Sequence, residues 1–499
     1  MNVLTDSRNI WLFFIMLLIL ALRLPTTHVS VIDWDESVYF TIAQDITNGG
    51  VPFKTMWDTK GPLLFFILVP VILLFDENIA ALRVFTTCYL LLSMFFLYLL
   101  ARRLFQGFTA LIPPLIYGLF FTTQGLGGYA SNGELFMMLP LILALIFYVE
   151  YEKKGGGSLL FLSGLFSCAA FFTKGTAVFT AFVVPLYIVW NNLRRGTEGV
   201  KQFVIESAYY SSGVLLTILA VTFYFFVNGA VYDFYHTYFV INGVYVGVVP
   251  FRYALINLYK FMYGTFVWTR DFTTILAAVS ALVILIQLIR KKVGGEEKKA
   301  LCFILALAVL SLVGVLWGRR MFPHYYLQMG LAYSLLIALA VSTIGAKRIY
   351  LQALILVLTA GFLIRYPIQE TVRYIKDEDK NWFEAETSYA VADYIKSNTS
   401  DDDTILVIGG QPIIQFLADR KSPIKDFWWP NHHGELFDIL DLKSSVPATL
   451  DKNKPEYIVF YEGKYEGQIT HIDYLDEFIR KNYNLEKKLD GYYIYRVNK

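Results

Sequence analysis

Cysteine is scarce in this chain, with three residues in 499. Cys88, Cys168 and Cys302 all lie in apolar runs, and their separations fit neither a disulfide framework nor a cysteine-rich metal site. We therefore expect them to be core residues. The sequence also contains no internal repeat and no low-complexity tract.

Charge is scarce as well. Acidic and basic residues make up 17% of the chain, and the net charge of +2 reflects nearly balanced acids and bases. This balance gives no electrostatic reason to expect nucleic acid as a partner. Hydrophobic residues make up 56%, and the mean hydropathy is +0.49. These values are typical of an integral membrane protein with several spans in the lipid bilayer.

Two apolar runs near the N-terminus need interpretation. No small-residue cleavage site follows residues 10–24, so we expect a retained first span rather than a signal peptide. Residues 61–75 would reach about 22 Å as a helix, against roughly 30 Å of hydrocarbon. Pro70 also interrupts this run. We predict that it lies along or dips into the membrane without crossing it.

The remaining apolar runs predict further spans, at approximately 79–100, 108–123, 134–151, 156–173, 175–190, 204–228, 272–289, 300–317, 326–345 and 349–366. Together with the first run this makes about eleven spans. If residues 61–75 do not cross, the larger set of loop lysines and arginines lies in the cytoplasm, as the positive-inside rule requires. A multi-pass protein of the plasma membrane follows, with a cytoplasmic N-terminus and an external juxtamembrane loop at 25–78.

The composition changes after residue 367, where the membrane domain 1–367 is expected to end. Residues 368–499 are more charged and predict a small extracytoplasmic α/β domain. The expected elements are helices at 381–396 and 471–483 and strands at 404–408, 456–461 and 492–497. The predicted fold class is therefore an all-α polytopic membrane protein with a C-terminal soluble α/β domain.

The polar residues of the first external loop begin at Asp33. Asp33 followed by Glu36 forms a capping-box pattern, which predicts a helix that lies in the membrane interface until Asn48. Capping would be enough to account for Asp33 and Glu36, and a further role at the site is the equal alternative. Asp35 is not needed for the cap, and a carboxylate held at the membrane surface is placed to deprotonate an acceptor hydroxyl.

Two groups of basic residues could bind phosphate. Lys60 follows Asp58 and precedes a Gly-Pro turn, which suits an anionic lipid headgroup, although a lone interfacial lysine usually just extends to water. Arg319 and Arg320 lie at a span end that the topology places outside. Because guanidinium groups bind phosphate oxygens bidentately, this exception to the charge rule favours a phosphate site.

Other candidates are weaker. Glu134 opens a span, but helix N-termini favour carboxylates in any case, so a structural role is a strong alternative. The remaining weak candidates are Lys174, Asp233, His236, Arg252, Arg270, Asp271, His324, and the pairs Trp428-Trp429 and His432-His433.

Taken together, these elements resemble the C-class (GT-C) glycosyltransferases that use polyprenyl-phosphate sugars, in particular the family of protein O-mannosyltransferases and the lipid A aminoarabinose transferase. That family has an Asp-Glu pair in its first external loop, an acidic-x-Lys-x-Pro element, a later external acid and a Pro-x-Tyr element. The matching residues are Asp35-Glu36, Asp58 to Pro62, Glu134 and Pro323-His324-Tyr325. The resemblance covers residues 30–366. It departs from the family at Glu134, where aspartate is usual, and at Gly61, where the first proline of Lys-Pro-Pro is usual.

The resemblance implies inverting transfer of a sugar from a polyprenyl-phosphate donor to a hydroxyl acceptor on a glycolipid, protein or cell-envelope glycan. Asp35 would be the general base, with Glu36 and Glu134 as further catalytic residues. The donor phosphate would be bound by Lys60, Arg319, Arg320 and Tyr325. No cofactor is required, and a divalent metal ion held by Asp58 and His236 stays open.

Three alternatives remain. A membrane transporter would be expected to show matched halves with ionisable residues at mid-membrane, whereas the polar residues here gather at one surface. A non-catalytic lipid-glycan binding or assembly protein is the second alternative. The third is an oligosaccharide ligase that uses lipid diphosphate donors.

Overall fold

The computed structural model describes residues 7–264, 272–289, 295–343, 360–361, 363–376, 385–408, 412–425, 442–461, 473–489 and 491–498. Contacts divide the chain into two compact units. The membrane unit contains Met1–Thr26, Arg83–Tyr224 and Val249–Glu378. The juxtamembrane unit contains Thr27–Leu82, Phe225–Val248 and Asp379–Lys499.

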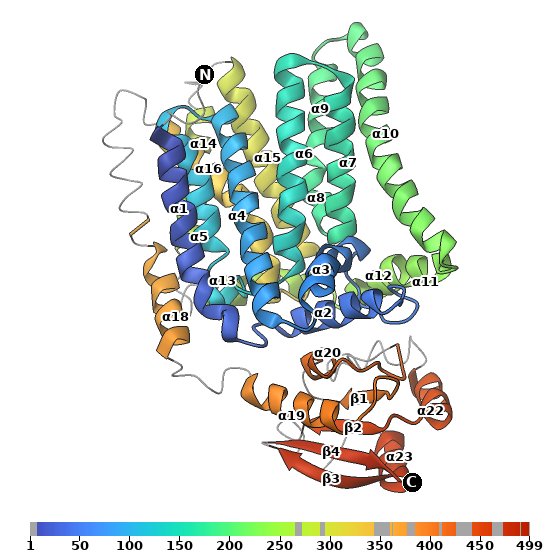
Figure 1. Cartoon of the computed structure of the whole chain (residues 1–499). Coiled ribbons are helices and arrows are strands. Elements are labelled where there is room, and N and C mark those ends of the chain that lie inside the picture. Colours follow the sequence, from blue (N-terminus) through green and yellow to red (C-terminus); the bar gives the residue numbers. More distant parts are fainter. Residues whose placement is uncertain are drawn as a thin grey trace. The chain divides into compact units, whose positions relative to one another are not determined.

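The membrane unit is a bundle of helices (Figure 1). They are α1 (Ser7–Arg23), α4 (Ile79–Leu104), α5 (Ile112–Phe120), α6 (Gly133–Lys154), α7 (Gly157–Thr173), α8 (Ala177–Ala181), α9 (Val183–Leu193), α10 (Thr197–Val227), α13 (Phe251–Gly264), α14 (Thr273–Ile289), α15 (Gly295–Trp317), α16 (Gly330–Ser342) and α18 (Arg365–Lys376), with 3-10 turns at Gly107–Leu111 and Pro323–Met329. Helix α6 packs along α7, and α16 packs against α5, α14 and α15.

Six helices in the described residues are long and apolar enough to cross a membrane: Ser7–Thr27, Ile79–Leu104, Gly133–Lys154, Gly199–Val227, Lys298–Trp317 and Pro323–Ser342. The predicted spans at 108–123, 156–173, 175–190 and 272–289 correspond to shorter apolar helices. The predicted span at 175–190 is divided between α8 and α9. Most of the predicted span at 349–366 lies outside the described residues.

Arg23 fixes the turn that leads into α6. Its guanidinium is 1% exposed and donates to the backbone oxygens of Phe121 (2.6 Å), Gly128 (2.8 Å) and Tyr129 (2.9 Å). Buried carbonyl groups need such donors, since an unpaired one is costly. The end of α1 therefore holds the loop from which Glu134 starts its helix.

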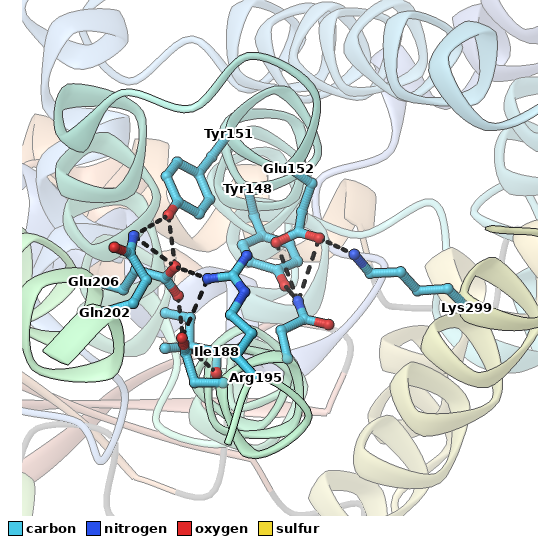
Figure 2. Close-up of polar contacts among 10 residues, drawn as sticks. Tyr148, Tyr151, Glu152, Ile188, Arg195, Gln202, Glu206 and Lys299 are labelled. Atoms are coloured by element: carbon cyan, nitrogen blue, oxygen red, sulfur yellow. Dashed lines mark hydrogen bonds and ion pairs between the residues drawn. The ribbon is translucent and has the colours of Figure 1, made fainter. Parts of the chain in front are cut away.

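A polar network joins four helices at the other end of α6 (Figure 2). The carboxylate of Glu206 on α10 accepts hydrogen bonds from Tyr151 and Asn192 at 2.8 Å, Gln202 at 3.0 Å and Arg195 at 3.2 Å. Glu152 on α6 accepts from Asn191 on α9 and pairs with Lys299 on α15. Glu134 and Glu152 are about 27 Å apart along the helix. The network therefore ties α6, α9, α10 and α15 together far from the Glu134 end.

The juxtamembrane unit contains α2 (Trp34–Thr47), α3 (Pro62–Phe75), α11 (Val231–Tyr235), a π-helical turn (His236–Ile241) and α12 (Asn242–Gly247). Helix α3 begins with Pro62 at its first position and contains Pro70. Its length is about 21 Å, short of the hydrocarbon thickness. Phe53, at φ +69°, packs among Phe65, Phe225 and Phe234 and joins α3 to α11.

The same unit contains the predicted α/β domain. Its elements are α19 (Ala385–Ser397), β1 (Ile405–Ile408), α20 (Ile413–Ala418), α22 (Leu442–Lys452), β2 (Tyr457–Tyr461), α23 (Asp473–Asn482), β3 (Tyr483–Leu489) and β4 (Tyr492–Val497). The strand order is β1-β2-β4-β3, with β1 parallel to β2 and the other pairs antiparallel. Apolar clusters cover both faces of the sheet, one beneath α19 and α20 and the other beneath α22 and α23. The fold class predicted from the sequence is confirmed.

Candidate active site

Helix α2 begins as the capping pattern predicts. Asp33 is the N-cap, and its Oδ1 accepts the backbone N–H of Asp35 at 3.1 Å. Glu36 is fully buried, and its Oε1 accepts the N–H of Ile32 at 2.6 Å, one residue earlier than a standard capping box would place it. Both Asp33 and Glu36 therefore hold the start of the helix.

Asp35 lies in the first turn of α2, where the helix dipole favours a negative charge. Its side chain is 26% exposed, and its Oδ2 accepts the hydroxyl of Tyr39 at 3.0 Å and pairs with Lys60 Nζ at 3.2 Å. Tyr39 was not among the predicted site residues. Its spacing of four residues from Asp35, which places both on one helix face, was the signal that could have found it.

Lys60 links the two acidic elements of the first external loop. Its ammonium is 3.3 Å from Asp58 Oδ1 as well as 3.2 Å from Asp35 Oδ2, and it lies 5.5 Å from the centre of the Tyr39 ring. Asp58 Oδ1 also accepts the backbone N–H of Lys60 at 2.9 Å, which fixes the turn into α3. The structure thus brings Asp35, Asp58 and Lys60 together, with one cation between two carboxylates.

Burial raises the pKa of Asp58 above its ordinary value of 3.8. The Lys60 cation opposes this rise and the Asp35 carboxylate adds to it. The folded protein therefore holds the Asp58 proton more tightly than the unfolded chain does. Burial also raises the pKa of Asp45, which lies near the C-terminal end of α2.

We expect Asp58 to lower the apparent unfolding temperature, relative to Asp58→Asn, as the pH rises from 3.8 through the raised pKa of Asp58. The reason is that Asp58 must lose a proton that the fold favours. Asp58→Asn should flatten this slope, while the new amide keeps an oxygen for the Lys60 N–H. Thermal unfolding in detergent across this pH range measures the effect, with Asp45→Asn as the matched variant that removes only the second contribution. Equal slopes for wild type and Asp58→Asn would contradict a raised pKa for Asp58.

The predicted metal ligands Asp58 and His236 each contact another side chain. Asp58 is engaged by Lys60, and the ring of His236 stacks on Tyr232 at 5.4 Å. Across the described residues, no group of three metal-ligating side chains contains Asp58 or His236. A divalent metal ion held by Asp58 and His236 stays a prediction.

In the membrane unit, Glu134 pairs with Lys174, which was one of the weakest candidates on sequence grounds. Glu134 lies in the first turn of α6 and is 1% exposed, and its Oε1 contacts Nζ of Lys174, the residue that ends α7. Lys174 Nζ also lies 4.9 Å from the centre of the Tyr325 ring. Glu134 Oε2 is buried and accepts no hydrogen bond from the described residues.

The two arginines lie in a strained turn after α15. Arg319 and Met321 have φ values of +55° and +54°, which are unfavourable for residues with a side chain. Arg319 donates to the Val249 carbonyl at 2.9 Å, so part of its guanidinium is already used. A Cβ at Gly318 would lie 2.6 Å from the Tyr325 ring, so glycine allows that ring to approach. Arg270, Asp271 and the pairs at 428–429 and 432–433 lie outside the described residues.

Comparison with known proteins finds one matching family model and two solved structures with a similar fold. Residues 59–224 match the family model described as dolichyl-phosphate-mannose-protein mannosyltransferase. ArnT from Cupriavidus metallidurans, solved bound to undecaprenyl phosphate, is similar with a TM-score of 0.65 and 11% identity, covering 97% of each chain. An oligosaccharyltransferase from Archaeoglobus fulgidus, in complex with zinc and sulfate, has a TM-score of 0.51 and 14% identity over 97% of this chain and 73% of its own. No curated protein sequence matches the chain.

Proposed function

Because the chain has the fold of the C-class membrane glycosyltransferases, we propose that it is an inverting glycosyltransferase of the extracytoplasmic membrane face. It moves a sugar from a polyprenyl-phosphate donor to a hydroxyl acceptor. The observation that carries this proposal is the contact of Asp35 with Lys60, since it places a base beside a cation suited to phosphate. The lipid phosphate bound to the similar ArnT supports the donor class.

In the proposed reaction, Asp35 takes the proton of the acceptor hydroxyl. The acceptor oxygen forms a bond to the anomeric carbon on the side opposite the phosphate, whose C–O bond breaks. The polyprenyl phosphate leaves with the electron pair, and the configuration at the anomeric carbon is inverted. Tyr39 holds Asp35 in place through its hydroxyl, while Asp33 and Glu36 position the helix start.

Lys60 has two roles in the proposed reaction. Its positive charge stabilises the negative charge that accumulates on the departing phosphate. Before the donor binds, the same charge is shared by Asp35 and Asp58. A phosphate that binds Lys60 would compete with Asp35 for the ammonium group, so donor binding and the position of the base would be linked. We assign Arg320 and Tyr325 to the phosphate from their motif, with Arg319 holding the turn.

Glu134 is assigned to the transferred sugar. A buried carboxylate oxygen that accepts nothing from the described residues suits a substrate hydroxyl as its donor. In this assignment Lys174 pairs with Glu134 and holds its carboxylate in place.

Transfer can be tested with membranes that contain the protein and labelled polyprenyl-phosphate mannose or polyprenyl-phosphate pentose. We expect label to appear in a product other than the donor, with release of polyprenyl phosphate. Donor binding without transfer to any acceptor would instead favour a non-catalytic lipid-glycan binding protein. Donor movement across the bilayer without cleavage would favour a transporter.

Lys60→Ala should raise the donor KM by about tenfold or more, because a charge-assisted contact to phosphate is worth about 1.5–3 kcal/mol. Lys54→Ala is the matched control, since Lys54 is an exposed lysine of the same loop that donates to the Asn228 carbonyl. Kinetics over a range of donor concentration measure the difference. An unchanged KM in Lys60→Ala would remove Lys60 from the phosphate site.

A further inference from the structure

The polar side of α2 is covered by the C-terminal domain. The sequence predicted a helix lying in the interface, and such a helix would leave Thr41 and Gln44 in water. In the structure Thr41 is 2% exposed and Gln44 is 5% exposed. The covering element is α20, which packs against α2.

Gln44 provides the polar part of this contact. Its Nε2 donates to the Phe416 carbonyl at 3.1 Å and to Asp419 Oδ1 at 3.0 Å, and it is 3.2 Å from Glu77 Oε1. The rings of Phe40 and Phe416, both fully buried, lie 5.9 Å apart. Buried amide groups require such partners, so the contact is specific as well as apolar.

The contact is fixed from the side of the C-terminal domain. Asp419 ends α20 in the left-handed region, with φ +50°. Arg420, 5% exposed, donates to the Asp419 carbonyl at 2.9 Å and to the Thr399 carbonyl at 3.0 Å. Asp419 is therefore held against the end of α19 and presents its carboxylate to Gln44 from a rigid position.

A second contact lies beyond α3. Lys396 on α19 is 3.4 Å from Glu77, the same carboxylate that Gln44 approaches. The domain thus touches both α2 and the segment that follows α3. Because Gln44 approaches the same Glu77, α2, the domain and the segment after α3 meet at this one carboxylate.

The contact faces away from Asp35. Gln44 follows Asp35 by nine residues, which is about two and a half helical turns, so the two side chains leave α2 on opposite sides. On the side of α2 that carries Asp35, Tyr39 packs against Phe65 of α3, with the ring centres 6.2 Å apart. Helix α2 is therefore held between α3 and α20, and a shift of α20 would move Asp35 without touching it.

We propose that the C-terminal domain is a positioning element for α2: through Gln44, Phe416 and Asp419 it fixes the rotation of the helix and hence the place of Asp35. The catalytic part of this inference depends on the proposed function. Displacement of a reacting group by about 1 Å can cost about a hundredfold in rate. Loss of one contact of this kind should cost about tenfold in kcat and leave the donor KM within about twofold.

The full-length protein in liposomes allows a test in which the domain stays folded. Asp419→Gly removes one acceptor of Gln44 and leaves the Phe416 carbonyl, and glycine suits φ +50°, so α20 itself should not be weakened. Asp419→Asn is the conservative variant, because asparagine keeps an oxygen for Gln44 and tolerates the left-handed region. Phe416→Ala removes the apolar part of the same contact.

Two cysteine reporters follow the helix independently of sugar transfer. Each is placed in a background in which Cys88, Cys168 and Cys302 are alanine. Thr41→Cys reports on the covered side and Asp35→Cys on the opposite side, both through the rate of reaction with a membrane-impermeant maleimide. With Asp419→Gly or Phe416→Ala we expect a rise of about tenfold at position 41 and a changed rate at position 35, with wild-type rates in Asp419→Asn.

The outcomes separate the two proposals. Changed rates at both positions, together with a fall in kcat from labelled polyprenyl-phosphate mannose or pentose at constant KM, support the positioning role. A rise at position 41 with no change at position 35 or in kcat overturns it, as does an unchanged rate at position 41. If the wild type transfers no sugar, the proposed function fails, while the two labelling rates still decide whether the domain positions α2.

Discussion

Asp35→Asn is expected to lower kcat for sugar transfer by about 10²–10⁴, the range typical for loss of a general base. Asparagine keeps the size of the side chain and an oxygen for the Tyr39 hydroxyl, so the helix start should be unchanged. What disappears is the group that takes the acceptor proton. Transfer rates at saturating donor and acceptor measure the effect.

The neighbouring acid gives the matched control for Asp35→Asn. Asp33→Asn also removes one negative charge from the start of α2, but asparagine caps a helix as well as aspartate does. It should therefore keep most of the activity. Tyr39→Phe should lie between the two, because it removes only the hydrogen bond to Asp35. Full transfer activity in Asp35→Asn would refute the assignment of the base.

The parts of the site that could be predicted are those formed by residues close in sequence. The cap at Asp33 and the turn at Asp58 are hydrogen bonds between residues two positions apart, so they depend on local sequence alone. The break before α3 is similarly local, since Pro62 begins the helix. The strands β1, β2 and β4 were predicted because buried β-branched and aromatic runs have a clear pattern.

The parts that could not be predicted depend on tertiary contacts. Lys174 is forty residues from Glu134, and its sequence context between two short apolar runs gave no reason to pair them. The residues that bury Gln44 lie more than 370 positions away in the sequence. Strand β3 was missed because most of its residues are exposed and charged at the edge of the sheet, where pairing with β4 decides its structure.

Lys174→Met is expected to destabilise the membrane unit by about 3–5 kcal/mol, the cost of removing one partner of a buried ion pair. Glu134 is 1% exposed and Lys174 is 6% exposed, so water cannot easily replace the lost ammonium. Methionine has nearly the volume of the lysine stem and still fills the space beside Tyr325. The apparent unfolding temperature in detergent should fall, whereas Lys54→Met, at an exposed lysine, should leave it unchanged.

The double variant Lys174→Met/Glu134→Leu separates stability from function. With both charges removed, no unpaired carboxylate remains, and replacing a buried pair by apolar residues is often neutral or stabilising. Most of the lost stability should therefore return. Sugar transfer should not return with it, because Glu134 is the group we assign to a sugar hydroxyl. A double variant no more stable than Lys174→Met would show that the two residues do not act as a pair, and one that is both stable and fully active would leave Glu134 with only a structural role.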